Sequence, residues 1–132
     1  MCLDNETLDD NVIEEWTVVF RDPIKYHWCQ KYLKKGFLHC FAFKRSPGGQ
    51  FYMVVDPARS HIHIDLLPCN DETFQALTKN NHYVTIIKSI NLDYDRGGFC
   101  RFNCVEVVKG LLGISAPWAI TPYQLFRRLR NE

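Results

Sequence analysis

A β-hairpin pattern in residues 36–57 is the strongest constraint on the fold. Two apolar runs, GFLHCFAFKR and QFYMVVDP, flank the turn sequence SPGG. Aromatic and β-branched residues on both sides of a Pro- and Gly-containing turn are typical of two antiparallel strands. A turn centred on Pro47 and Gly48 places His39 directly opposite Asp56, on a face that is otherwise apolar. A slip of one residue in the pairing would separate these two side chains, since successive residues of a strand face opposite ways.

The rest of the chain predicts an α+β fold, with an antiparallel meander sheet packed against helices. Strand patterns occupy residues 15–21, 60–67 and 82–89, and helix patterns occupy 22–36, 71–79, 103–114 and 121–129. We expect one domain over residues 1–132, whose acidic start at 1–13 is frayed.

Composition excludes several classes of function. Sixteen Lys and Arg against fifteen Asp and Glu give a net charge of +1, which offers no surface for general nucleic-acid binding. No apolar run approaches the roughly 20 residues needed to span a bilayer, and no signal segment opens the sequence. We therefore expect a cytoplasmic protein whose six cysteines are free thiols.

Cys104 lies where a Gly-containing loop meets an apolar helix. Asn103 and Glu106 form the pattern of a capping box, which makes Cys104 the first helical residue. Free backbone N–H groups and the helix dipole lower a thiol pKa at such a position. Cys104 is therefore a candidate nucleophile.

All five histidines precede Cys104 in the chain, so a Cys–His pair must run in the order His then Cys. A cysteine hydrolase also needs a polar group that orients the imidazole and backbone donors for the oxyanion. The predicted pairing of His39 with Asp56 supplies an imidazole and such a group.

The sequence YDRGG at 94–98, followed by Asn103 and Cys104 before an apolar helix, resembles NlpC-type thiol hydrolases of the papain-like fold. A His strand that precedes the cysteine helix is similar to the circularly permuted branch, which includes lecithin retinol acyltransferase relatives. The pattern, which ends in a Thr-Pro-Tyr-Gln helix, is also similar to small uncharacterised bacteriophage proteins. The resemblance covers residues 37–130.

This resemblance implies that Cys104 is the nucleophile, His39 the general base and Asp56 the orienting residue. It implies a cysteine hydrolase or acyltransferase that acts on an amide, peptide or ester and needs no cofactor and no metal. We assign contacts with the peptide or acyl substrate to Tyr94, Gly98 and Trp118.

Each of these residues also has a structural interpretation. A cysteine on an apolar helix is commonly a small buried hydrophobe. His39 can be a hydrogen-bonded core histidine, and Asp56 before Pro57 can simply start a turn.

Two other functions are compatible with the sequence. His61 and His63 lie on one face of a strand, and with Cys100 and Cys104 they would supply two imidazoles and two thiolates for a small zinc-binding domain. Alternatively, the domain is a catalytically inactive accessory protein of a bacteriophage that binds a host or virion protein in the host cytoplasm. Tyr94, Trp118 and Tyr123 would then serve as aromatic anchors.

Overall fold

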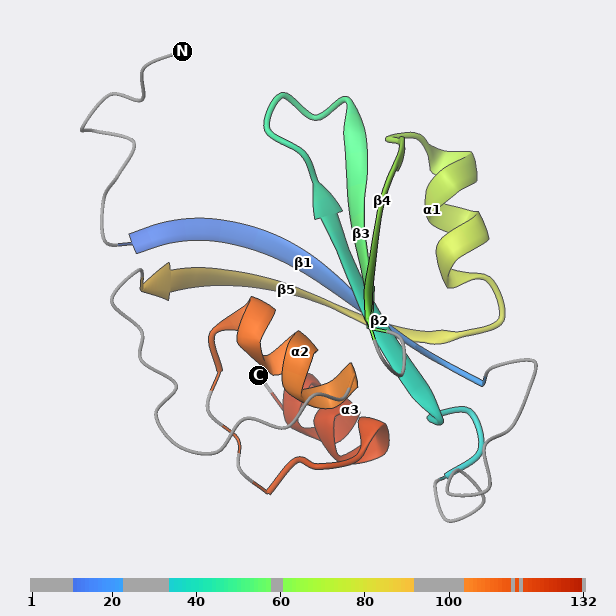
Figure 1. The fold of residues 1–132 in the computed structure, drawn as a ribbon, viewed down its shortest axis with the longest axis vertical. Coiled ribbons are helices and arrows are strands. Elements are labelled where there is room, and N and C mark those ends of the chain that lie inside the picture. The colour runs from blue at the N-terminus through green and yellow to red at the C-terminus, as the bar shows by residue number, and fades with distance from the viewer. Residues whose placement is uncertain are drawn as a thin grey trace.

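The structure is a computed structural model that describes residues 11–22, 34–57, 61–91, 104–114, 116 and 118–131. In chain order its elements are β1 (Asn11–Arg21), β2 (His39–Arg45), β3 (Phe51–Pro57), β4 (Ile62–Pro68), α1 (Asp71–Thr78), β5 (His82–Asn91), α2 (Cys104–Leu112) and α3 (Pro122–Arg130). The α+β prediction is confirmed (Figure 1).

The five strands form one antiparallel sheet in the order β4-β3-β2-β1-β5. Strands β1 to β4 are a meander, as predicted. The chain then passes through α1 and returns to pair β5 with β1 at the other edge. The sheet is therefore a meander with one long crossing connection, and β4 and β5 are its edges.

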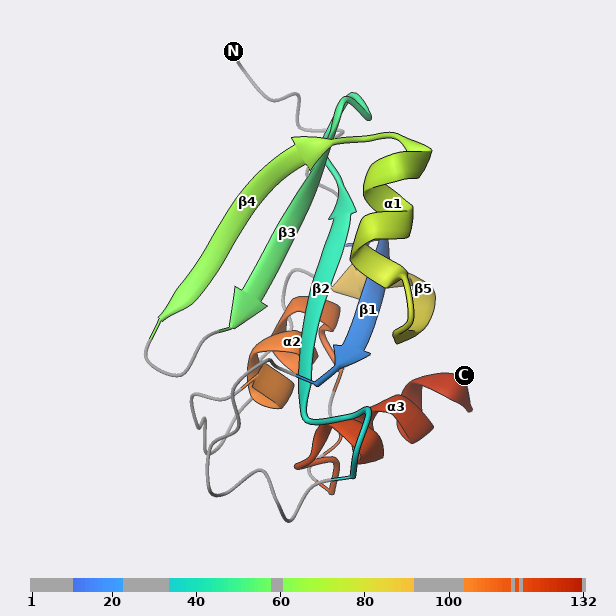
Figure 2. The same cartoon turned by 90° about the vertical axis from the view of Figure 1, so that its right-hand side faces the viewer.

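Helices cover both faces of the sheet, so the described fold has three layers. Helix α1 lies on one face, and α2 and α3 lie on the other (Figures 1 and 2). Two apolar clusters fill the two interfaces, because alternate residues of each strand point to opposite faces. The larger cluster, under α2 and α3, includes Phe20, Cys40 and Val108; the smaller, under α1, includes Phe41 and Tyr52.

The predicted register of the β2–β3 hairpin is wrong by two residues. Phe43 pairs with Val54 and Arg45 pairs with Tyr52. The loop is longer than a tight two-residue turn, because the Ser46 amide bonds to the Phe51 carbonyl and Gly48 and Gly49 both take positive φ values. A shift of two residues leaves every side chain on its predicted face.

Several predicted boundaries also need correction. Strand β1 begins at Asn11, so the expected frayed segment 1–13 extends too far into the chain. Most of the helix predicted over 22–36 lies outside the described residues. The residues at the two ends of this range are hydrogen-bonded to each other, because the Gly36 amide donates to the Asp22 side chain over 2.7 Å.

Helix α3 begins as the sequence predicts. The Thr121 hydroxyl accepts from the Gln124 amide over 3.3 Å, and the Gln124 side chain accepts from the Thr121 amide over 3.1 Å. This capping box satisfies donors at the start of the helix.

Helix α2 begins at Cys104 as predicted. Val105, Val108 and Leu112 are buried, whereas Leu111 is only partly buried. Lys109 is also buried, and its ammonium donates to the Ala116 carbonyl over 3.0 Å and pairs with Glu106 over 3.1 Å. Buried Lys is tolerated when it is paired in this way.

None of the helices in the described part of the chain has the length and apolar character needed to cross a bilayer.

Leu112→Ala is expected to lower the free energy of unfolding by about 2–5 kcal/mol, because it removes a fully buried side chain from the larger cluster. Leu111→Ala is the matched control and should cost clearly less, since Leu111 is partly exposed. Urea denaturation followed by circular dichroism measures both. Equal losses would contradict the helix orientation.

Candidate active site

The sheet opens between β2 and β3 at one end, and the candidate site lies at this opening. Backbone pairing between the two strands runs from Arg45–Tyr52 to Ala42–Val55. Beyond that point the start of β2 continues to pair with β1, and the end of β3 continues to pair with β4. The lower ends of β2 and β3 therefore diverge (Figure 2).

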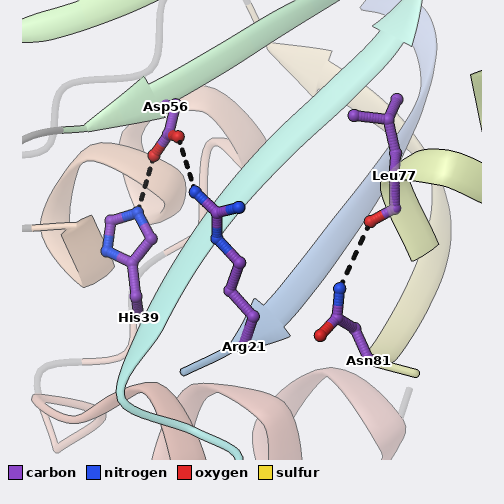
Figure 3. Close-up of polar contacts among 5 residues, drawn as sticks. All are labelled: Arg21, His39, Asp56, Leu77 and Asn81. Atoms are coloured by element: carbon purple, nitrogen blue, oxygen red, sulfur yellow. Dashed lines mark hydrogen bonds and ion pairs between the residues drawn. The ribbon is translucent and has the colours of Figure 1, made fainter. Parts of the chain in front are cut away.

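His39 and Asp56 connect the two strands across this opening. The His39 Nε2 donates to the Asp56 Oδ1 over 2.6 Å (Figure 3). The residues are diagonal rather than direct neighbours, because the observed register is shifted by two. Diagonal pairs on one face remain within reach of long side chains, so the predicted contact forms although the predicted register does not.

Arg21 is a site residue that the sequence did not reveal. It lies opposite His39 on β1, and its Nη2 donates to the Asp56 Oδ2 over 3.1 Å (Figure 3). Its guanidinium carbon lies 5.0 Å from the centre of the Phe41 ring, a cation–π contact. Both oxygens of Asp56 are thus engaged, one by the imidazole and one by the guanidinium.

Cys104 reaches this opening from the α2 face of the sheet. It is the first residue of α2, and α2 contacts both β2 and β3. Its sulfur lies near the side chains of Cys40 and His39, and both lower its pKa. Because Asp56 engages Nε2, the His39 nitrogen available to the sulfur is Nδ1. The imidazole therefore lies between the thiol and the carboxylate.

The charges of the site stabilise a thiolate beside an imidazolium. The hydrogen bond from Cys40, together with the hydrogen bond and charge of His39, lowers the pKa of Cys104 to about 5 against the effect of burial. Burial lowers the pKa of His39, but hydrogen bonds to Asp56 and Cys104 and the charges of both outweigh it and raise that pKa to about 9. Between these values Cys104 is a thiolate and His39 is protonated.

Asp56 stays ionised in this arrangement. Burial would raise the pKa of its carboxyl, but the hydrogen bond and charge of His39 lower it, with further contributions from Arg21 and His63. A carboxylate held by two cationic partners fixes the orientation of the imidazole.

Cys40 is the second site residue that the sequence did not reveal. It follows His39 in β2 but points to the opposite face, where it is fully buried under α2. Hydrogen bonding from its side chain and from its backbone lowers the pKa of Cys104. Burial raises the pKa of the Cys40 thiol, so Cys40 remains a protonated donor while Cys104 is ionised. Apart from His39, its sequence neighbours are apolar, and nothing in that pattern distinguishes it from an ordinary core cysteine.

Of the three predicted substrate-contact residues, the structure describes only Trp118. Trp118 lies between α2 and α3 with 55% of its surface exposed, and its contact with substrate stays a prediction. Tyr94 and Gly98 lie outside the described residues, as does Asn103, the predicted helix cap.

The four proposed zinc ligands are only partly described. His61 and His63 share a face as predicted, with ring centres 5.4 Å apart. Cys100 lies outside the described residues. Within the parts of the chain that the structure describes, no three His, Cys, Asp or Glu side chains are grouped to hold a metal ion.

Comparison with known proteins gives no relative: the chain matches no family model, no curated protein and no solved structure. The chemistry of the site must therefore be judged from its own geometry.

The pH dependence of Cys104 alkylation tests the thiolate. The rate with iodoacetamide should rise through pH about 5 and reach a plateau well below the roughly 8.5 of an ordinary thiol. Mass spectrometry of the modified peptides assigns the rate to each cysteine, and Cys104→Ser is the control that removes the low-pH reaction. A half-maximal rate near 8.5 would show that Cys104 is not activated.

Asp56→Asn should move that midpoint to higher pH. A neutral amide cannot stabilise the imidazolium, so the pKa of His39 falls and the thiolate loses a nearby positive charge. The alkylation profile of the variant measures the shift, and Asp65→Asn, which changes an exposed carboxylate on β4, is the matched control. An unchanged profile would mean that Asp56 does not act on Cys104 through His39.

Proposed function

We propose that this protein is a cysteine hydrolase or acyltransferase that acts on an amide, peptide or ester. The observation that carries the proposal is the position of His39, which is hydrogen-bonded to Asp56 over 2.6 Å and whose pKa is raised by both Asp56 and the nearby Cys104. A nucleophile, a base and an orienting group in this order are the components of thiol-dependent acyl transfer.

In the proposed mechanism the Cys104 thiolate attacks the carbonyl carbon of the substrate. The first backbone N–H groups of a helix have no partner within the helix. Those at the N-terminus of α2, where Cys104 lies, would stabilise the oxyanion. The His39 imidazolium then gives its proton to the leaving group as the acyl-enzyme forms. Water or an amine next attacks the acyl carbon while neutral His39 accepts its proton. A new C–O or C–N bond forms, the S–C bond breaks, and the Cys104 thiolate and the imidazolium are restored.

The order of the site residues supports a circularly permuted papain-like fold of the NlpC type. The His strand comes first, the carboxylate follows on the next strand, and the cysteine helix comes last. An antiparallel sheet with the cysteine helix on one face is also compatible with that fold. The resemblance to small bacteriophage proteins makes the host cytoplasm the proposed location. Cys40, Cys69 and Cys104 are free thiols, which fits a reducing compartment.

A catalytically inactive binding protein of a bacteriophage is the second candidate, and one observation favours it. Edge strand β4 exposes Ile64 and Leu66 on one face, with 64% and 60% of their surfaces accessible. A row of exposed apolar residues on an edge strand is typical of a surface that binds another protein, here a host or virion protein. Such a protein would retain its binding after loss of Cys104.

Cys104→Ala should abolish acyl transfer and keep the fold, and His39→Gln should lower the rate by about 10²- to 10⁴-fold, the usual contribution of a general base. A panel of p-nitrophenyl esters and peptide p-nitroanilides provides the substrates. Cys69→Ser is the control, since Cys69 packs against the smaller cluster under α1. Turnover that survives in Cys104→Ala would refute the mechanism, and no turnover in the wild type would favour the binding protein.

A further inference from the structure

The Cys104 thiol has a second thiol beside it, and the proposed acyl transfer does not require a second thiol. Cys40 is fully buried, whereas Cys104 is partly exposed at the start of α2. Cys104 packs against the apolar cluster that contains Cys40, and hydrogen bonding between the two side chains raises the pKa of Cys40 and lowers that of Cys104. The pair therefore consists of one partly exposed cysteine and one fully buried cysteine.

We propose that Cys104 and Cys40 form a dithiol site for hydroperoxides, in which peroxide converts the pair to a reversible disulfide. The pair is a site of oxidative modification. Its oxidation does not require acyl-transfer activity, although both reactions use Cys104. Its substrate class is a small hydroperoxide, either hydrogen peroxide or an organic hydroperoxide.

The first step takes place at the sulfur of Cys104, the partly exposed cysteine. The Cys104 thiolate attacks an oxygen of the hydroperoxide, so that an S–O bond forms and the O–O bond breaks. The sulfur is oxidised to a sulfenic acid, and the leaving alkoxide or hydroxide takes a proton and departs as an alcohol or water. The low pKa of Cys104 favours this step, because the thiolate is the form that reacts.

The second step takes place at the buried sulfur. Cys40 attacks the Cys104 sulfur, an S–S bond forms and the S–O bond breaks. The departing hydroxide leaves as water with the proton of Cys40. A dithiol or another thiol reductant later restores both cysteines by exchange.

The fold selects Cys40 as the partner of Cys104. Cys69, the other free cysteine among the described residues, packs against the smaller cluster on the α1 face of the sheet. Cys40 and Cys104 meet on the α2 face. A fully buried Cys40 is protected from direct oxidation, so it is available when Cys104 has reacted.

The test is peptide mapping of the full-length, reduced protein after treatment with hydrogen peroxide. We expect a disulfide between Cys40 and Cys104, loss of iodoacetamide labelling at Cys104, and full recovery of labelling after dithiothreitol. In Cys40→Ser the sulfenic acid has no partner, so irreversible sulfinic acid at Cys104 should rise about tenfold over the wild type. Cys69→Ser is the matched control and should behave as the wild type does.

Three outcomes would overturn the proposal: a disulfide between Cys104 and a cysteine other than Cys40, equal sulfinic acid in the wild type and Cys40→Ser, or no reaction of Cys104 with peroxide. Cys40→Ala, checked by circular dichroism, replaces Cys40→Ser if the buried hydroxyl prevents folding. Because the readout is the mass of the peptides, it is independent of acyl transfer. A failed hydrolase assay would therefore leave this result unaffected.

Discussion

The hydrogen bond from His39 to Asp56 is the interaction on which the candidate site depends. It spans the opening between β2 and β3, where the backbone ladder has already ended. Without it the imidazole would have no fixed direction, and the sulfur of Cys104 would lose its cationic neighbour. The Arg21 guanidinium donates to the other oxygen of the carboxylate. The Asp56 side chain on β3 therefore links this strand to both β1 and β2.

The sequence predicts the features that depend on local patterns. The hairpin, the start of α2 at Cys104 and the capping box of α3 follow from turn residues, helix caps and apolar periodicity. The sequence also predicts the contact between His39 and Asp56, although the predicted turn between β2 and β3 is two residues shorter than the observed loop. The prediction succeeded because an error of two residues preserves the face of a strand, whereas an error of one would have reversed it.

The features that the sequence did not reveal depend on contacts between distant segments. Arg21 joins the site through the pairing of β1 with β2, which no turn sequence specifies. Cys40 becomes distinctive only when α2 packs over it. The burial of Lys109 is missed for a similar reason, since its acceptor is the carbonyl of Ala116 beyond the end of the helix. Its charge predicts an exposed position until that carbonyl is known.

The docking of α2 across β2 and β3 also affects when the site can exist. His39 is synthesised early in translation and Cys104 late. The two residues meet only after α2 has been synthesised and has packed on the sheet. Until α2 has packed on the sheet, Cys104 therefore lacks the two neighbours, Cys40 and His39, that lower its pKa.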